Sequence, residues 1–170
     1  MFENSVKDWI TNFLSTKNPA FNNLPPCPFA KQALLEDKIV FHYLNPIDRL
    51  TMSEYISCEL ENFSYHWPKG KEVVVIGCDP TLITSDELSE SVDRSNEKFL
   101  DNRGYIALED HPDEKEKVLD VSLNQGVYVL VLLQEKTKLF KARRILSKQN
   151  YYKYWTEEYY SEVVPNDDTS

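Results

Sequence analysis

One apolar run constrains the fold of this 170-residue chain more than any other feature. Residues 73–77 read Val-Val-Val-Ile-Gly, with no polar residue among them. A strand that is covered on only one face alternates apolar and polar residues, whereas an unbroken run is typical of a strand buried on both faces. The run therefore predicts a central strand with helices packed on each side of it.

Helical and strand-like patterns alternate along the rest of the chain. Further strand patterns, rich in β-branched and aromatic residues, occur at 38–44, 105–108 and 126–133. Helical periodicity occurs at 5–16, 29–35, 45–66, 84–102 and 136–153. This alternation predicts a single α/β domain over residues 1–155, with about four strands in a mostly parallel sheet flanked by helices. Because four strands and two long helices also suit it, a ferredoxin-like α+β fold is the alternative.

Local signals predict where helices begin and where the domain ends. Asn45-Pro46 joins a capping residue to a proline at the first helical position, so we expect the long helix to begin there. Thr84 and Glu87 have the spacing of a capping box for the next helix. From Thr156 onward the residues are acidic and lack a clear pattern, which predicts a C-terminal tail at 156–170.

The charge of the chain is unevenly distributed. The formal net charge is −9, but residues 136–153 hold seven cations and no acid, so the remainder carries −16. An acidic protein repels nucleic acid and anionic membranes at long range. No apolar run reaches the roughly 18 residues of a membrane span, and the four glycines form no phosphate-binding loop. We therefore expect no nucleic-acid partner, no membrane partner, no cofactor and no metal.

The cysteines bear on the compartment of the protein. The three cysteines, at 27, 58 and 78, are an odd number without a Cys-x-x-Cys spacing. This pattern argues against a disulfide framework and against a zinc site. Reduced cysteines are typical of the cytoplasm, which is the predicted location.

One of these cysteines lies in a stretch that is unusually rich in proline, Pro25-Pro26-Cys27-Pro28. Because Pro28 suits the first position of a helix, Cys27 is predicted to cap that helix. A thiol at a helix N-terminus faces free backbone N–H groups and the positive end of the helix dipole, which favour the thiolate. The alternative is that Cys27 is a small buried residue in a rigid turn.

A second candidate residue, His111, follows the strand pattern at 105–108. The helix after Cys27 leads into strand 38–44, so we expect Cys27 near the C-terminal end of that strand. If the two strands are parallel, Cys27 and His111 share one edge of the sheet, where open α/β sheets bind ligands. A thiolate nucleophile with a histidine base oriented by Asp113 or Asp110 would make a thiol-dependent enzyme. The alternative is that His111 is a loop histidine whose ring caps an acidic turn.

The two motifs resemble those of a widespread bacterial family of uncharacterised function. Cys-Pro-Phe-Ala-Lys at 27–31 is similar to a motif that follows the N-terminal helix of that family. His-Pro-Asp at 111–113 is similar to a later motif, and the likeness in layout extends over about residues 5–135. The resemblance implies that the two motifs belong together, and it implies no reaction.

The basic segment and the aromatic residues after it form another candidate site. Its predicted binding residues are Lys141, Arg143, Arg144, Lys148, Tyr151, Tyr154 and Trp155. Basic and aromatic residues alternate in this way in proteins that bind single-stranded nucleic acid. Because the rest of the chain is acidic, we expect instead a dock within the molecule, a homo-oligomer, or an acidic protein partner, since tyrosine and tryptophan are enriched at interfaces.

Two classes of function are therefore open, and the sequence slightly favours the first. A non-catalytic binding or interaction module would need an exposed aromatic patch at Tyr151, Tyr154 and Trp155, with Cys27 buried. A thiol-dependent enzyme would need Cys27 partly exposed and within hydrogen-bond reach of His111. No complete catalytic signature is present in the sequence, which is why the binding class is preferred.

Overall fold

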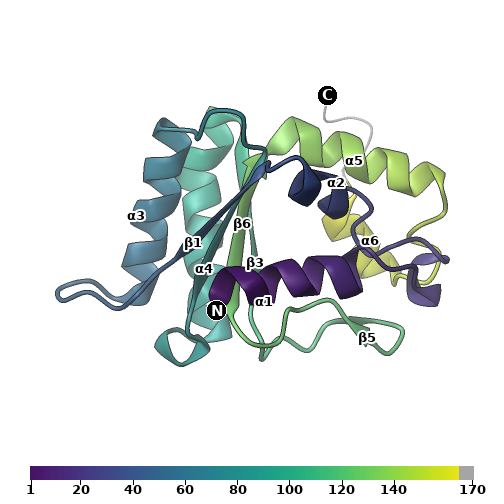
Figure 1. Cartoon of the computed structure of the whole chain (residues 1–170), viewed down its shortest axis with the longest axis horizontal. Coiled ribbons are helices and arrows are strands. Elements are labelled where there is room, and N and C mark those ends of the chain that lie inside the picture. The colour runs from purple at the N-terminus through teal and green to yellow at the C-terminus, as the bar shows by residue number, and fades with distance from the viewer. Residues whose placement is uncertain (165–170) are drawn as a thin grey trace.

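The computed structural model describes residues 1–164 and contains a four-stranded sheet in the order β1-β2-β6-β3 (Figure 1). Its strands are β1 (Ile39–Tyr43), β2 (Val73–Cys78), β3 (Tyr105–Asp110) and β6 (Val129–Glu135). β1 and β2 pair in parallel, whereas β6 is antiparallel to both of its neighbours, β2 and β3. The α/β class is confirmed. The sheet is mixed because a loop, and not a crossover helix, leads from β3 into β6.

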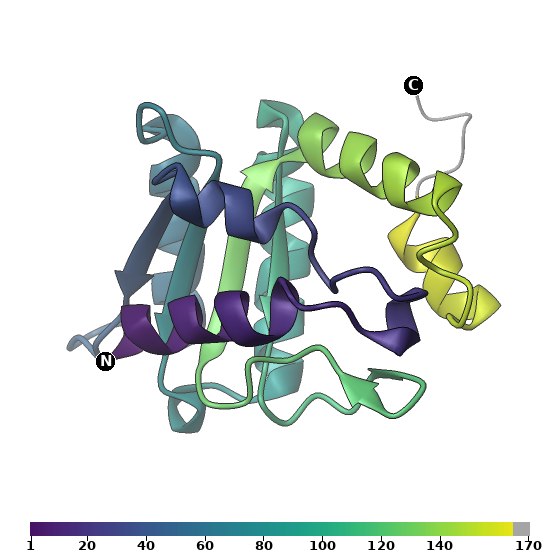
Figure 2. The same ribbon diagram turned by 45° about the vertical axis from the view of Figure 1, so that its right-hand side comes forward.

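Helices cover both faces of the sheet (Figure 2). The helix α1 (Phe2–Trp9), continued by a π-helical turn (Ile10–Leu14), crosses one face beside α2 (Ala30–Leu35). α3 (Met52–Tyr65) and α4 (Ser85–Ser95) pack on the other face. α5 (Lys136–Lys148) and α6 (Glu157–Val163) lie to one side of the sheet. Because α3 joins neighbouring parallel strands, the connection differs from the split arrangement of a ferredoxin-like fold.

Short elements complete the described part of the chain. The hairpin strands are β4 (Lys117–Val118) and β5 (Val121–Ser122), which pair with each other and lie outside the main sheet. Single 3₁₀ turns occur at Pro19–Phe21, Pro80–Leu82 and Asp101–Arg103, and a second π-helical turn at Asn96–Leu100 extends α4. None of the helices in residues 1–164 combines the length and the apolar composition needed to cross a bilayer.

The apolar run at 73–77 is buried on both faces, as its sequence predicts. Val74 and Ile76 point into the core formed with α3 and α4. Val75, which lies on the opposite face of the strand, packs in the cluster formed with α1. Full burial of one such side chain contributes roughly 1.5–3 kcal/mol, so this strand is a large part of what holds the two helical layers together.

The capping box of α4 is present where the sequence predicts it. The Thr84 hydroxyl accepts the backbone N–H of Glu87 at 3.2 Å, and the Glu87 carboxylate accepts the backbone N–H of Thr84 at 2.9 Å. The helical segment ends at Gly104, whose φ of +79° is accessible to glycine at little cost.

The prediction that the long helix begins at Asn45-Pro46 is wrong. α3 begins at Met52, where Thr51 and Glu54 form the capping box that the helix uses. Arg49 has a φ of +77°, in the left-handed region, and this conformation interrupts any helix that starts at residue 46. The segment between β1 and Thr51 is therefore a loop.

The C-terminal segment folds back onto the body of the protein. α5 ends at Lys148, and the chain reverses at Asn150, whose φ is +56°. Tyr151 and Tyr152 are then buried in a small second core that includes Phe21. Part of the predicted acidic tail belongs to this core, since α6 and Val164 pack there. Residues 165–170 of the predicted tail lie outside the described residues.

Candidate binding cavity

A cavity of about 540 Å³ lies between the α1 face of the sheet and the C-terminal helices. The sheet forms its floor through Val73, Val75 and Leu132. The walls come from α1, α2, α5 and the aromatic segment after α5, and they include Val6, Trp9, Ile10, Leu14, Ala30, Ala33, Leu139, Ala142, Leu146, Tyr151, Tyr152 and Trp155. This volume falls in the range of roughly 300–1,000 Å³ that is typical of small-molecule sites.

Small side chains account for the unfilled space. Ala30 and Ala33 of α2 and Ala142 of α5 line the cavity at positions where a larger side chain would occupy it. α5 follows β6 without an intervening loop, and the backbone N–H of Lys136 donates to the carbonyl of Gly104 at 2.9 Å. This bond fixes the direction of α5 at its start. Protein interiors are otherwise packed nearly as densely as organic crystals, so a space of this size is an exception.

The exposed residues of the lining lie at the start of α2 and on α5, and they mark the side on which the cavity meets solvent. Phe29 and Ile145 line it and are 44% and 41% exposed, which is unusual for large apolar side chains. Lys138 and Lys141 also line the cavity and are exposed. The mouth therefore combines apolar side chains with positive charge.

Arg143 is the charged residue that faces the aromatic wall. It is half-buried, and burial lowers the pKa of its guanidinium, while Tyr151, Tyr152 and Tyr159 act in the opposite direction. Within residues 1–164, the arginine ion pairs are those of Arg94 and Arg103, and no hydrogen bond or ion pair involves the Arg143 side chain.

Cys27 also lines the cavity, but it does not cap a helix. Its backbone N–H donates to the carbonyl of Leu14 at 2.9 Å, and α2 begins only at Ala30, with Phe29 as its N-cap residue. Burial raises the pKa of the Cys27 thiol, and this effect outweighs the backbone N–H groups of Phe29 and Ala30, which lower it. The predicted thiolate is therefore disfavoured at neutral pH.

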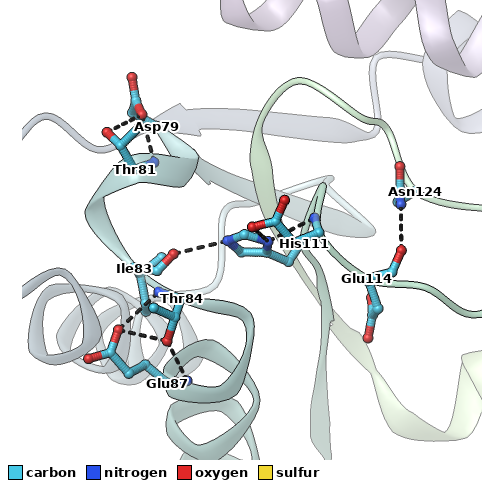
Figure 3. A network of polar contacts seen from close by, with 9 residues as sticks. Asp79, Thr81, Ile83, Thr84, Glu87, His111, Glu114 and Asn124 are labelled. Carbon is cyan, nitrogen blue, oxygen red and sulfur yellow. Dashed lines mark hydrogen bonds and ion pairs between the residues drawn. The ribbon is translucent and has the colours of Figure 1, made fainter.

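His111 is a buried structural residue (Figure 3). Its Nε2 donates to the carbonyl of Ile83 at 2.9 Å, and its Nδ1 accepts the backbone N–H of Asp113 at 3.1 Å. Only 1% of the residue is exposed. Both ring nitrogens of a neutral imidazole are thus used, which fits the interpretation of His111 as a loop histidine. The Asp113 carboxylate is exposed and lies 3.8 Å from Nδ1.

The structure does not bring Cys27 and His111 to one edge of the sheet. The cavity beside Cys27 borders Ile39 and Val73, the first residues of β1 and β2, whereas His111 follows the last residue of β3. β3 points in the same direction as β1 and β2. The expectation fails because the six residues of α2 rise only about 9 Å, too little to return along a strand of about 16 Å.

The predicted basic and aromatic binding residues divide into different environments. Lys141, Arg143, Tyr151 and Trp155 line the cavity, whereas Arg144, Lys148 and Tyr154 are not among its lining residues. Tyr151 is 4% exposed and its hydroxyl donates to the carbonyl of Pro26, while Trp155 stacks on Tyr159 with ring centroids 4.4 Å apart. These two side chains therefore form an inner wall, and the expected exposed aromatic patch is not formed.

Some cavity residues carried no distinct signal in the sequence. Trp9 has the helical spacing of an ordinary core residue, and Ala142 resembles any small residue on an amphipathic helix. Tyr152 adjoins Tyr151, which the aromatic pattern did indicate. As for metals, residues 1–164 contain no group of three or more His, Cys, Asp or Glu side chains arranged to hold an ion.

Comparisons with protein families, with curated proteins and with solved structures find no match to this chain. The resemblance of its two short motifs to a bacterial family therefore stays a prediction.

Proposed function

We propose that this protein is a non-catalytic binding protein that holds an apolar small molecule in the cavity. The observation that carries the proposal is a space of about 540 Å³ whose floor and walls are mainly aliphatic and aromatic. The basic aromatic C-terminal segment serves as one wall of this site. In this proposal the segment binds the ligand from inside the molecule, as part of the cavity wall, and not a partner at an exposed patch.

Because its lining is mainly apolar, the cavity favours occupation by an apolar ligand over occupation by water. A water molecule in a cavity needs about two to four polar partners, and the aliphatic part of this lining supplies none, whereas apolar cavities take up apolar guests. A ligand that fills the space would remove apolar surface from water at roughly 25 cal/mol per Å². The exposed Phe29 and Ile145 give such a molecule an apolar entrance.

An interaction with an acidic protein or with a second copy remains a separate proposal. Lys148 and Tyr154 support it, because both are exposed and lie outside the cavity lining. The thiol-enzyme alternative has weaker support, since desolvation raises the pKa of the thiol of the half-buried Cys27 and both nitrogens of His111 are already bonded.

The test uses the uncharged dye Nile red, whose fluorescence rises in apolar surroundings, and the full-length protein. We expect saturable binding to the wild type. Ala142→Trp places an indole in the cavity and should weaken binding at least tenfold. Thr137→Trp is the matched control, because Thr137 is an exposed residue of α5 that does not line the cavity, and it should bind as the wild type does.

Two results would count against the proposal. One is a wild type that gives no saturable fluorescence increase. The other is equal binding by Ala142→Trp, Thr137→Trp and the wild type, which would place the dye elsewhere on the surface. Circular dichroism of each variant verifies that it is folded.

A further inference from the structure

We infer that the ligand carries one carboxylate at the end of an apolar chain, and that Arg143 and Tyr152 bind this carboxylate inside the cavity. The inference rests on the proposed function and adds the chemical class of the ligand. Its basis is a pair of neighbouring polar side chains in a lining that is mainly apolar. Arg143 and Tyr152 supply hydrogen-bond donors there, and both line the cavity.

Arg143 brings a positive charge to the lining of the cavity. A guanidinium stays protonated in proteins and presents its donors in a planar fork that fits a carboxylate. Arg143 is half-buried beside three tyrosines, and no carboxylate of residues 1–164 lies within 4 Å of its guanidinium. A half-buried charge without an ion-pair partner has lost part of its hydration, so an anion that enters the cavity gains by binding it.

The hydroxyl group of Tyr152 supplies a further hydrogen-bond donor in the cavity. The residue is 8% exposed and lines the cavity, and within residues 1–164 its hydroxyl makes no hydrogen bond. Burial raises the pKa of Tyr152 to about 12, against the opposing effect of Arg143, so the hydroxyl remains a donor at neutral pH. The guanidinium of Arg143 and the hydroxyl of Tyr152 are therefore two neighbouring donors that line the same cavity and have no acceptor within the described residues.

The charge around the cavity is positive on balance. Its lining includes Lys138, Lys141 and Arg143, and the carboxylate of Glu72 is paired with Lys38 at 3.0 Å. This positive local charge contrasts with the net charge of −9 of the whole chain. Cations at the mouth would attract an anionic ligand and orient it on entry.

The test compares decanoate with 1-decanol, which has the same chain length and no charge, by displacement of Nile red at pH 7.5. We expect the wild type to bind decanoate at least tenfold more tightly than decanol. In Arg143→Met this preference should fall to about twofold or less, whereas decanol affinity should stay within about twofold. A preference of tenfold or more is what hydrogen bonds to a charged group commonly contribute. Tyr152→Phe should reduce the preference by about threefold to tenfold.

Two further variants make the comparison specific. Arg144→Met removes the same charge from the same helix at a residue that does not line the cavity, and it should keep the full preference. Arg143→Lys keeps the charge and should restore part of the preference. Because each preference is a ratio measured within one variant, a loss of folded protein affects both ligands equally.

The outcomes separate this inference from the proposed function. Equal affinities for decanoate and decanol in the wild type would overturn the inference, while displacement of Nile red by both would leave the proposed function in place. A preference that persists in Arg143→Met, or that is lost equally in Arg144→Met, would overturn the role of Arg143. If neither ligand displaced the dye and the dye itself failed to bind, the proposed function would fail first.

Discussion

Asp110, the last residue of β3, is a carboxyl group placed where water hardly reaches it. Only 9% of the residue is exposed, and its carboxylate accepts the backbone N–H of Gln125 at 2.9 Å. This bond ties the end of β3 to the loop that leads into β6. Burial raises the pKa of Asp110 to about 7, although the Gln125 N–H and the neighbouring His111 lower it.

This pKa predicts how the stability of Asp110→Asn depends on pH. The unfolded carboxyl titrates near pH 3.9, so between about pH 4 and pH 7 the folded state binds more protons and the wild type loses stability as the pH rises. Asparagine cannot ionise and its carbonyl oxygen can still accept the Gln125 N–H. The variant should therefore gain on the order of a few kcal/mol over the wild type at pH 7.5, and little at pH 4.5.

Urea unfolding of both proteins at the two pH values measures this difference. Other buried carboxyls, such as Glu109, titrate in both proteins and so largely cancel in the comparison. A stability difference that is the same at pH 4.5 and pH 7.5 would contradict the prediction.

Burial also explains why the candidate catalytic residues could be named from the sequence while their states could not. The proline-rich turn does hold Cys27 in a fixed loop, and His111 does follow a strand. What the sequence lacks is the surroundings of each side chain, which raise the pKa of the Cys27 thiol and use both nitrogens of His111. These surroundings come from residues that are distant in the chain, such as Ile83, whose carbonyl accepts the hydrogen bond from His111.

At the level of elements, the position of α1 on the sheet depends on a glycine. A Cβ atom added at Gly77 would lie 2.1 Å from Cε2 of Phe2, far inside contact distance. The Phe2 ring is held in turn by Tyr43 and Tyr128, with ring centroids 5.2 and 5.3 Å away. β2 thus carries a residue without a side chain where the first turn of α1 packs.

Gly77→Ala should therefore destabilise the protein by about 1–3 kcal/mol, as overpacking of a core commonly does. The cost should be smaller in a Phe2→Leu background, because the ring that the new methyl group meets is then absent. A double-mutant cycle measured by urea unfolding gives the coupling between the two positions. Equal costs of Gly77→Ala in both backgrounds would show that the contact with Phe2 is not what requires glycine.

Element boundaries were predictable where one local signal acted alone. Thr84 and Glu87 cap α4 as their spacing predicts, and Gly104 ends that helical segment. The start of α3 was predicted wrongly at Asn45-Pro46, because the left-handed backbone at Arg49 separates that pair from the helix, which is capped by Thr51. The hairpin β4–β5 was not predicted, since each strand has only two residues.

At the level of the whole molecule, the cavity is assembled from segments that are far apart in the chain. Trp9 of α1, the sheet residue Leu132 and Trp155 after α5 all line it. Periodicity within one segment indicates which face is buried, but it carries no information on how closely two buried faces approach. The α/β class could therefore be predicted from the sequence, and the cavity required the tertiary arrangement.

The measurement that tests the cavity as a ligand site most directly is an NMR titration of the tryptophan indoles with 1-decanol. The chain has three tryptophans. Trp9 and Trp155 line the cavity, whereas Trp67 packs in the core of the opposite face, where its Nε1 donates to the carbonyl of Lys71 at 2.9 Å. Trp67 is thus an internal control within the same spectrum.

We expect the ¹⁵N–¹H indole signals of Trp9 and Trp155 to shift together and to saturate as decanol is added, while the signal of Trp67 stays in place. An uncharged ligand makes this result independent of the role of Arg143. Signals of Trp9 and Trp155 that do not move, or a shift of Trp67 as large as theirs, would contradict the account of the cavity as a binding site.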